Sequence, residues 1–257
     1  MQEKQVGVQG LNVNYKIAGE GKPLLILHGW GSSSDKWADV QNFLSLKGFQ
    51  VVVPDLPGFG KTPPPKEVWG IEEYAGFLNA FVAAMGFEKF ILAGHSIGGQ
   101  IAVQFALDYP EKLRKLVLIA AAAVRRKPSL RLRFTTYTAK MLWLLVYFAP
   151  INVKTNLRNI GYKAIRRSDY RKAEGIMQDV FQRVIRQDLS GVLRSVAIPT
   201  VVLWGSDDKI TPLRDGKFIA REIPSAKLEI IPGSGHNIYV DKPEELKQAM
   251  KDILSHE

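Results

Sequence analysis

The 257-residue chain contains no cysteine and only four histidines, and both shortages narrow the chemistry that it can perform. Without cysteine it can form no disulfide, offers no thiolate nucleophile and lacks the thiolate ligands of many zinc and iron–sulfur sites. Such a chain suits a reducing compartment. With four histidines, a reaction that needs an imidazole base has few residues to draw on.

Long apolar runs are also missing. The longest, MLWLLVYFA at 141–149, is about half of the roughly 20 residues that a membrane-spanning helix requires. The first ten residues, MQEKQVGVQG, contain no apolar signal core. We therefore expect a soluble, cytoplasmic protein.

Acidic residues are scarce in one region. Between positions 121 and 195, sixteen Lys and Arg stand against four Asp and Glu, so this segment carries +12 while the rest of the chain carries about −2. The basicity thus belongs to one insert, and peripheral contact of that insert with an anionic membrane is a hypothesis. No recognised nucleic-acid-binding module accompanies the charge, so we expect no nucleic-acid partner.

Outside the insert, short apolar runs alternate with amphipathic segments. Residues 4–18 alternate around Gly10 and Asn12, which predicts an antiparallel hairpin. Buried parallel strands are predicted at 23–27, 49–53, 90–93, 116–120, 200–204 and 228–231. Helices are predicted at 35–46, 71–85, 97–107, 213–222 and 243–254, the last with a capping box of Asp241 and Glu244.

This alternation predicts an α/β fold, with a mostly parallel central sheet flanked by helices. It stops at about position 121, where basic amphipathic helical patterns take over, and it resumes near Ile198. We therefore expect residues 1–120 and 197–257 to form one core domain. Residues 121–196 are expected to form a helical cap, inserted between two strands.

A serine lies at the point where one strand passes into a helix. Ser96 stands in AGHSIGG, with Gly94 two residues before it and Gly98 two residues after it. A sharp turn there would make side chains at both glycine positions collide, and would lift the hydroxyl clear of the sheet edge. The alternative is a glycine-rich turn with a helix cap, but the strand–turn–helix context favours a nucleophile.

A serine nucleophile needs a base, usually a histidine that a carboxylate orients. His28 ends an early strand, His95 adjoins the serine, and His256 is next to the chain end. His236 follows the last predicted strand and so lies at the same sheet edge as Ser96.

The orienting acid should follow the strand at 200–204. Asp207 and Asp208 both do, and because successive residues point opposite ways, only one can reach the imidazole. Spacing does not choose between them.

Two backbone amides are candidates for stabilising an oxyanion. The loop LHGWG at 27–31 follows the strand beside the central one, and its glycines allow the N–H of Trp30 to approach a substrate carbonyl. The N–H of Ile97, at the start of the helix after Ser96, is its expected partner. The alternative for this loop is a tight turn that merely begins the next helix.

Five motifs together carry a family resemblance. They are HGWG at 28–31, DLPGFG at 55–60, GHSIGG at 94–99, WGSDDKITP at 204–212 and GSGHN at 233–237. In this order the chain resembles the α/β-hydrolase superfamily over essentially its whole length, with residues 121–195 matching weakly. The resemblance implies a triad in the order Ser, Asp, His, and its G-x-x-D spacing favours Asp208 over Asp207. It also implies that His28 is structural.

The branch of the family depends on the site. Branches that dehalogenate or open epoxides use aspartate where this chain has Ser96. The serine branch includes carboxylesterases, lipases, lactonases, carbon–carbon bond hydrolases of ring-cleavage products and cofactor-free perhydrolases. HGWGSSS at 28–34 resembles small carboxylesterases more than the HGxGPG loop of the carbon–carbon hydrolases.

We therefore expect a serine hydrolase that cleaves small carboxylic esters with an apolar part, without a metal or an organic cofactor. Ser96, Asp208 and His236 are the expected catalytic residues. Trp30, Trp143 and Tyr147 are candidate substrate contacts. A slow-turnover ligand-binding receptor with the same fold and triad is the alternative from another class.

Overall fold

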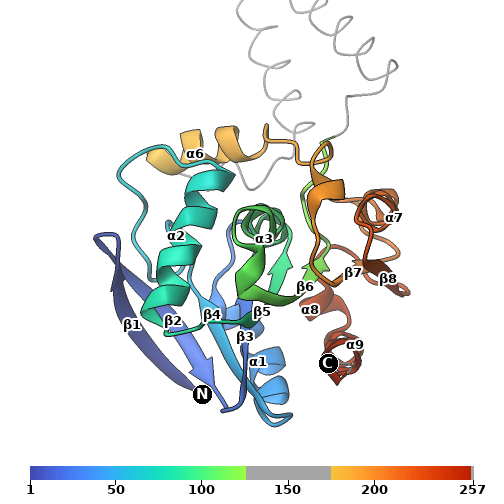
Figure 1. The fold of residues 1–257 in the computed structure, drawn as a ribbon, viewed down its shortest axis with the longest axis horizontal. Helices are drawn as coiled ribbons and strands as arrows, with labels where there is room; N and C mark the ends of the chain where they lie inside the picture. Colours follow the sequence, from blue (N-terminus) through green and yellow to red (C-terminus); the bar gives the residue numbers. More distant parts are fainter. Residues whose placement is uncertain (126–174, 256–257) are drawn as a thin grey trace, which may run out of the picture. The chain divides into compact units, whose positions relative to one another are not determined.

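An eight-stranded sheet runs through the part of the chain that the computed structural model describes, residues 1–125 and 175–255 (Figure 1). Its strands are β1 (Gln2–Val8), β2 (Leu11–Ala18), β3 (Lys22–Leu27), β4 (Phe49–Pro54), β5 (Phe90–His95), β6 (Leu113–Ile119), β7 (Thr200–Gly205) and β8 (Ala226–Ile231). In space they follow the order β1-β2-β4-β3-β5-β6-β7-β8. β2 pairs antiparallel with β1 and β4, and all other pairs are parallel.

Helices connect the parallel strands, and the last two follow the final strand. They are α1 (Ala38–Ser45), α2 (Ile71–Ala84), α3 (Ile97–Asp108), α6 (Ile176–Val184), α7 (Leu213–Glu222), α8 (Ile238–Asp241) and α9 (Pro243–Ser255). Short 3-10 helices occupy Ser34–Trp37, Pro110–Lys112 and Leu193–Ser195. Among the described residues, no helix combines the length and the apolar character needed to cross a bilayer.

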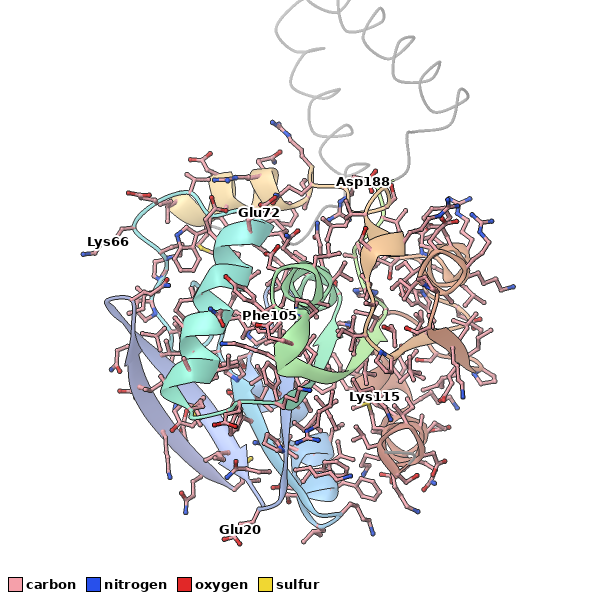
Figure 2. The ribbon with its side chains drawn as sticks, in the orientation of Figure 1. Glu20, Lys66, Glu72, Phe105, Lys115 and Asp188 are labelled. Atoms are coloured by element: carbon pink, nitrogen blue, oxygen red, sulfur yellow. The ribbon has the colours of Figure 1, made fainter. Side chains whose placement is uncertain are left out.

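Both faces of the sheet are buried, and the alternation of side chains along β3 shows why. Leu25 and Leu27 belong to a core shared with residues of α2, α3 and α7, while Leu24 and Ile26 belong to a second core shared with α1 and α9. Phe105 of α3, labelled in Figure 2, is fully buried in the first of these two cores. This two-faced burial explains the nearly continuous apolar strands.

Every predicted strand and helix is present, with boundaries that differ by up to three residues, and two predictions are corrected. The segment 35–46 is divided into a 3-10 helix at Ser34–Trp37 and α1. The capping box is wrong: Asp241 is the last residue of α8, and its carboxylate accepts a hydrogen bond from the N–H of Gly235 at 2.9 Å. This bond ties α8 to the loop that carries His236.

Part of the predicted cap packs with the sheet. Residues 126–174 lie outside the described residues, so the expected extent of the cap stays a prediction. The described stretch with α6 belongs to the same compact unit as the sheet. Gln187 accepts hydrogen bonds from the first turns of two helices. Its side-chain Oε1 accepts the N–H of Ile71 in α2 at 2.7 Å, and its backbone carbonyl accepts Gln100 Nε2 of α3 at 2.9 Å. Gln187 follows α6 closely, and Arg183 of α6 itself donates to Glu73 Oε1 of α2 at 2.6 Å. α6 is therefore held near the carboxyl edge of the sheet, where α2 and α3 begin.

Candidate active site

Ser96 occupies a strained turn between β5 and α3. Its φ is +54° and its ψ is −117°, values that residues with a side chain rarely adopt. The surrounding backbone enforces this conformation, because the N–H of Ser96 donates to Ile119 O at 3.0 Å and its carbonyl accepts the N–H groups of Gln100 and Ala122. Such strain persists only where the surroundings fix it, and it is concentrated at functional sites.

The flanking glycines have the steric reason that the sequence predicted. A Cβ at Gly94 would overlap the backbone of Gly98. A Cβ at Gly98 would lie 2.5 Å from Leu27 O, at the end of β3, and 2.6 Å from His28 O, in the loop that follows. The turn therefore closes only with glycine at both positions, and it brings Ser96 against that loop.

His236 bridges Ser96 and Asp208. Its Nε2 lies 3.0 Å from Ser96 Oγ, and its Nδ1 lies 2.8 Å from Asp208 Oδ2. The side chains of His236 and Asp208 are 8% and 0% exposed, so the pair is shielded from water. Burial alone would raise the pKa of Asp208, but hydrogen bonds from His236 and Thr211 outweigh burial and hold that pKa below its usual value. Asp208 is therefore an ionised acceptor near neutral pH.

Asp207 points elsewhere. It is exposed, its Oδ1 accepts the hydroxyl of Ser206 at 2.7 Å, and its N–H donates to Ser234 O at 2.9 Å. Of the two adjacent aspartates, the structure thus brings Asp208 and not Asp207 to His236.

Two other histidines are buried and support loops at this edge. His28 Nε2 accepts the N–H of Leu56 at 3.0 Å, and burial lowers the pKa of His28. His95 Nε2 lies 2.9 Å from the carbonyl oxygen of His236, and burial lowers the pKa of His95 to about 3. A neutral His95 donates from Nε2 to that carbonyl, which fixes the position of the His236 backbone. His256 lies outside the described residues.

The loop after β3 passes directly beside the serine. A Cβ added at Gly29 would lie 2.9 Å from His95 Nδ1 and 3.1 Å from Ser96 Cβ, so this close approach favours glycine. Trp30 follows in this loop, and Ile97 is the first residue of α3, where the helix dipole is positive. Within the described residues, neither the Trp30 N–H nor the Ile97 N–H donates to another backbone group.

The ring of Trp30 joins an aromatic contact between loops. Its centroid lies 4.8 Å from that of Phe59 and 4.8 Å from that of Phe181 on α6. Trp30 thus faces both the loop after β4 and the described part of the insert. Trp143 and Tyr147, the other candidate substrate contacts, lie outside the described residues.

Sequence reasoning missed Thr211. Its hydroxyl lies 2.7 Å from Asp208 Oδ2 and 3.1 Å from His236 Nδ1. A local signal was present, because an aspartate commonly accepts the backbone N–H groups two and three residues after it. Ile210 and Thr211 donate to Asp208 Oδ1 in this way, at 2.8 and 2.9 Å. Among residues 1–125 and 175–255, no three His, Asp or Glu side chains cluster as metal ligands would.

Comparisons with known proteins agree with the fold and with its hydrolytic character. Residues 22–171 and 147–243 match the family model described as the alpha/beta hydrolase fold. A 2-hydroxy-6-oxo-6-phenylhexa-2,4-dienoate hydrolase of Comamonas testosteroni is 26% identical, over 94% of this chain and 91% of that protein. A 2-hydroxymuconate semialdehyde hydrolase of Pseudomonas putida is 27% identical, over 98% of this chain and 94% of that protein.

Among solved structures, one is described as a membrane phospholipase A and a bacterial virulence factor. It shares 26% sequence identity with this chain at a TM-score of 0.77, and the match covers 99% of this chain and 86% of that one. The family model, the sheet order and the strained serine turn agree, and the chain belongs to the alpha/beta hydrolase family.

Proposed function

We propose that this hydrolase cleaves carboxylic esters through an acyl-enzyme intermediate formed on Ser96. The observation that carries the proposal is the unbroken chain of hydrogen bonds from Ser96 Oγ through His236 to Asp208, at 3.0 and 2.8 Å. A serine hydroxyl is a weak nucleophile unless an adjacent base accepts its proton. The arrangement supplies that base and the carboxylate that orients it.

The ionised state of Asp208 determines which nitrogen of His236 carries the proton. An ionised Asp208 can only accept, so His236 carries its proton on Nδ1 and has a free lone pair on Nε2. As Ser96 Oγ attacks the ester carbonyl, Nε2 takes the hydroxyl proton, and Asp208 stabilises the imidazolium that forms. The imidazolium then gives the proton to the leaving alcohol. Water, activated by the same imidazole, releases the acid and restores Ser96.

Charge on the carbonyl oxygen needs donors during both steps. In this proposal the backbone N–H groups of Trp30 and Ile97 supply them. Ile97 follows Ser96 in the chain, and Trp30 follows Gly29, which closely approaches Ser96. Neither N–H donates to another backbone group within the described part of the chain. Loss of one such donor costs about 10²–10³ in turnover. The positive end of the α3 dipole adds to this stabilisation.

An apolar ester, and specifically a lipid ester, is the substrate class that we favour. One relative is described as a membrane phospholipase A, and the predicted insert at 121–196 is strongly basic. Basic residues near an anionic surface contribute about 1 kcal/mol each, so peripheral contact with an anionic membrane would place the site beside such esters.

Carbon–carbon bond hydrolysis is the second candidate. The relatives described as a dienoate hydrolase and a semialdehyde hydrolase support it, because both match nearly the whole chain. Lactone and peracid chemistry on the same three residues, and slow turnover by a receptor, are further alternatives. The HGWGSSS loop favours esters among these.

The experiment is a panel of p-nitrophenyl esters of increasing acyl length, beside a 2-hydroxy-6-oxo-dienoate, with Ser96→Ala as the control. We expect hydrolysis of the esters by the wild type and none by Ser96→Ala. Equal rates for the two proteins would end the proposal. Faster cleavage of the dienoate would favour carbon–carbon chemistry, and a burst without steady turnover would favour the receptor.

Membrane contact is tested separately. Co-sedimentation at low salt should be stronger with vesicles that contain an anionic phospholipid than with neutral vesicles. Equal co-sedimentation with both kinds would remove the membrane hypothesis and leave the ester proposal intact.

A further inference from the structure

Thr211 presents its polar groups to the acid and to the residues around it. Its hydroxyl lies 2.7 Å from Asp208 Oδ2, 3.1 Å from His236 Nδ1 and 3.2 Å from Ala120 O. Its N–H donates to Asp208 Oδ1 at 2.9 Å, and its carbonyl accepts Trp204 Nε1 at 2.8 Å. The residue is 8% exposed. Its main chain is thus held on both sides, which fixes the hydroxyl against the acid and the imidazole.

The single hydroxyl proton has two acceptors within reach. Asp208 Oδ2 is nearer than Ala120 O and carries negative charge, so the hydroxyl of Thr211 donates to the carboxylate. A hydroxyl lone pair is then left for the Nδ1–H of His236. The carboxylate accepts four hydrogen bonds in all, two backbone N–H groups on Oδ1 and the hydroxyl and imidazole on Oδ2.

We propose that Thr211 is a positioning residue, whose hydroxyl holds Asp208 Oδ2 toward His236 and restrains the proton affinity of the imidazole. The inference rests on the proposed roles of Ser96, Asp208 and His236. The hydroxyl shares the negative charge on Oδ2. Without this donor Oδ2 would keep more of the negative charge and stabilise the imidazolium more strongly. This effect outweighs the loss of the longer contact with Nδ1, because the contact with Oδ2 is shorter and involves a full charge, so the acid limb of the rate profile should move to higher pH.

Other groups around His236 do not supply this effect. Asp208, Thr211, Ser96 and His95 contact His236, and the titratable residues that follow it in the chain are Tyr239 and Asp241. The His95 ring lies 4.9 Å from that of His236, but its pKa of about 3 leaves it uncharged. Burial raises the pKa of Tyr239, so it is neutral too. Asp241 is engaged with Gly235.

Three variants test the role. Thr211→Val keeps the side-chain shape and removes the hydroxyl, and Thr211→Ser restores a hydroxyl. Thr200→Val is the matched control, because Thr200 is also buried and its hydroxyl donates to Ile198 O at 2.7 Å, at the opposite end of β7. The measurements are the pH profile of kcat/KM with a p-nitrophenyl ester, and the NMR titration of the His236 ring, assigned with His236→Asn.

For Thr211→Val we expect kcat/KM at pH 7 to fall on the order of tenfold, the effect of losing one hydrogen bond to a charged group. The acid limb of the profile and the imidazole titration should both move to higher pH. Thr211→Ser should return both toward the wild type, and Thr200→Val should move neither. A purely structural role would lower activity or stability without moving the titration.

An unshifted His236 titration in folded Thr211→Val would overturn the inference. If that variant does not fold, Thr211→Ala makes the same comparison with a smaller side chain. Failure of the proposed function is distinguishable, because Ser96→Ala would then hydrolyse esters as fast as the wild type. The ring titration does not depend on turnover, so it tests Thr211 in either case.

Discussion

Two loops at the carboxyl edge of the sheet each hold a buried aspartate, but they hold it with different donors. Counted over the whole residue, backbone included, Asp55 after β4 is 2% exposed and Asp208 after β7 is 5% exposed. The donors to Asp55 are the N–H groups of Ser34 and Lys61 and the side-chain amide of Asn14, at 2.7, 2.9 and 2.9 Å. Asp208 accepts two backbone N–H groups, a hydroxyl and the imidazole of His236.

The difference separates a structural carboxylate from one that is able to assist a reaction. Burial tends to raise the pKa of each, and hydrogen bonds hold both pKa values below the usual range. The donors of Asp55 keep their protons near neutral pH, so Asp55 can only fix its loop. One donor of Asp208 is an imidazole whose other nitrogen faces Ser96 Oγ at 3.0 Å. A lowered carboxylate pKa therefore indicates a catalytic role only where one of the hydrogen-bond donors to the carboxylate is a titratable group that also contacts the nucleophile.

The largest expected effect comes from removing the charge of Asp208. Asp208→Asn presents an amide to His236 and favours the wrong tautomer, so kcat for ester hydrolysis should fall about 10⁴-fold. Steady-state kinetics measure kcat, and a thermal melt checks that the variant is folded. A folded Asp208→Asn protein with nearly normal kcat would break the comparison between the loops.

Asp55→Asn should show the opposite balance. It removes a buried charge and turns one acceptor atom into a donor that faces the amides of its loop, so we expect a loss of about 2–3 kcal/mol in the free energy of unfolding. Because no proton passes through Asp55, kcat at 25 °C should fall less than tenfold. Urea unfolding measures the loss of stability, and initial rates of ester hydrolysis measure the change in kcat. A loss of kcat as deep as in Asp208→Asn would contradict the structural role.

Two loops at this edge contact a buried neutral histidine, which predicts how stability depends on pH. The loop after β4 contacts His28, and the loop after β8 contacts His95. The pKa values of His28 and His95 are lower in the folded chain than when unfolded, because burial disfavours the charged ring. The unfolded chain therefore binds more protons as pH falls below about 6.5.

Stability is complete above that pH and is lost below it, by about 1.4 kcal/mol per pH unit for each histidine, with His95 contributing down to about pH 3. Urea unfolding at pH 7 and pH 5 measures the slope. His95→Gln should lower the slope by one proton, and a slope unchanged in that variant would contradict this account of His95.

The smallest effect is expected at Asp207. It is exposed and faces Ser206 rather than His236, so Asp207→Asn should leave kcat within about twofold and stability within ~0.5 kcal/mol. Parallel assays beside Asp208→Asn measure this. A deep loss of kcat in Asp207→Asn would reverse the assignment of the two acids.

The elements of the sheet were predictable because apolar runs of strand length alternate with amphipathic segments, and the structure has strands and helices at these places. The strained turn was predictable for a steric reason that Gly94 and Gly98 bear out. The capping box failed because α8, a single short turn, intervenes before α9 and takes Asp241.

The hydrogen-bond partners of Asp208 were harder to predict from the sequence. Adjacent aspartates look equivalent in sequence, and only the resemblance favoured Asp208. Asp55 and Asp208 also share the same pattern, an acid just after a buried strand. The donors that distinguish them come from distant parts of the chain, Asn14 and Ser34 for Asp55 and His236 for Asp208. The contact of Thr211 with His236 needs the loops after β7 and β8 to meet, which no local pattern encodes.

The most direct test of the account is covalent labelling of the nucleophile. The wild type, Asp208→Asn, Asp207→Asn and Asp55→Asn are treated with a fluorophosphonate, and the rate and the site of labelling are measured by intact-protein and peptide mass spectrometry. The account predicts a single label on Ser96, slowed steeply in Asp208→Asn and little changed in Asp207→Asn or Asp55→Asn. A label on another residue, or equal rates in the folded wild type and Asp208→Asn, would contradict it.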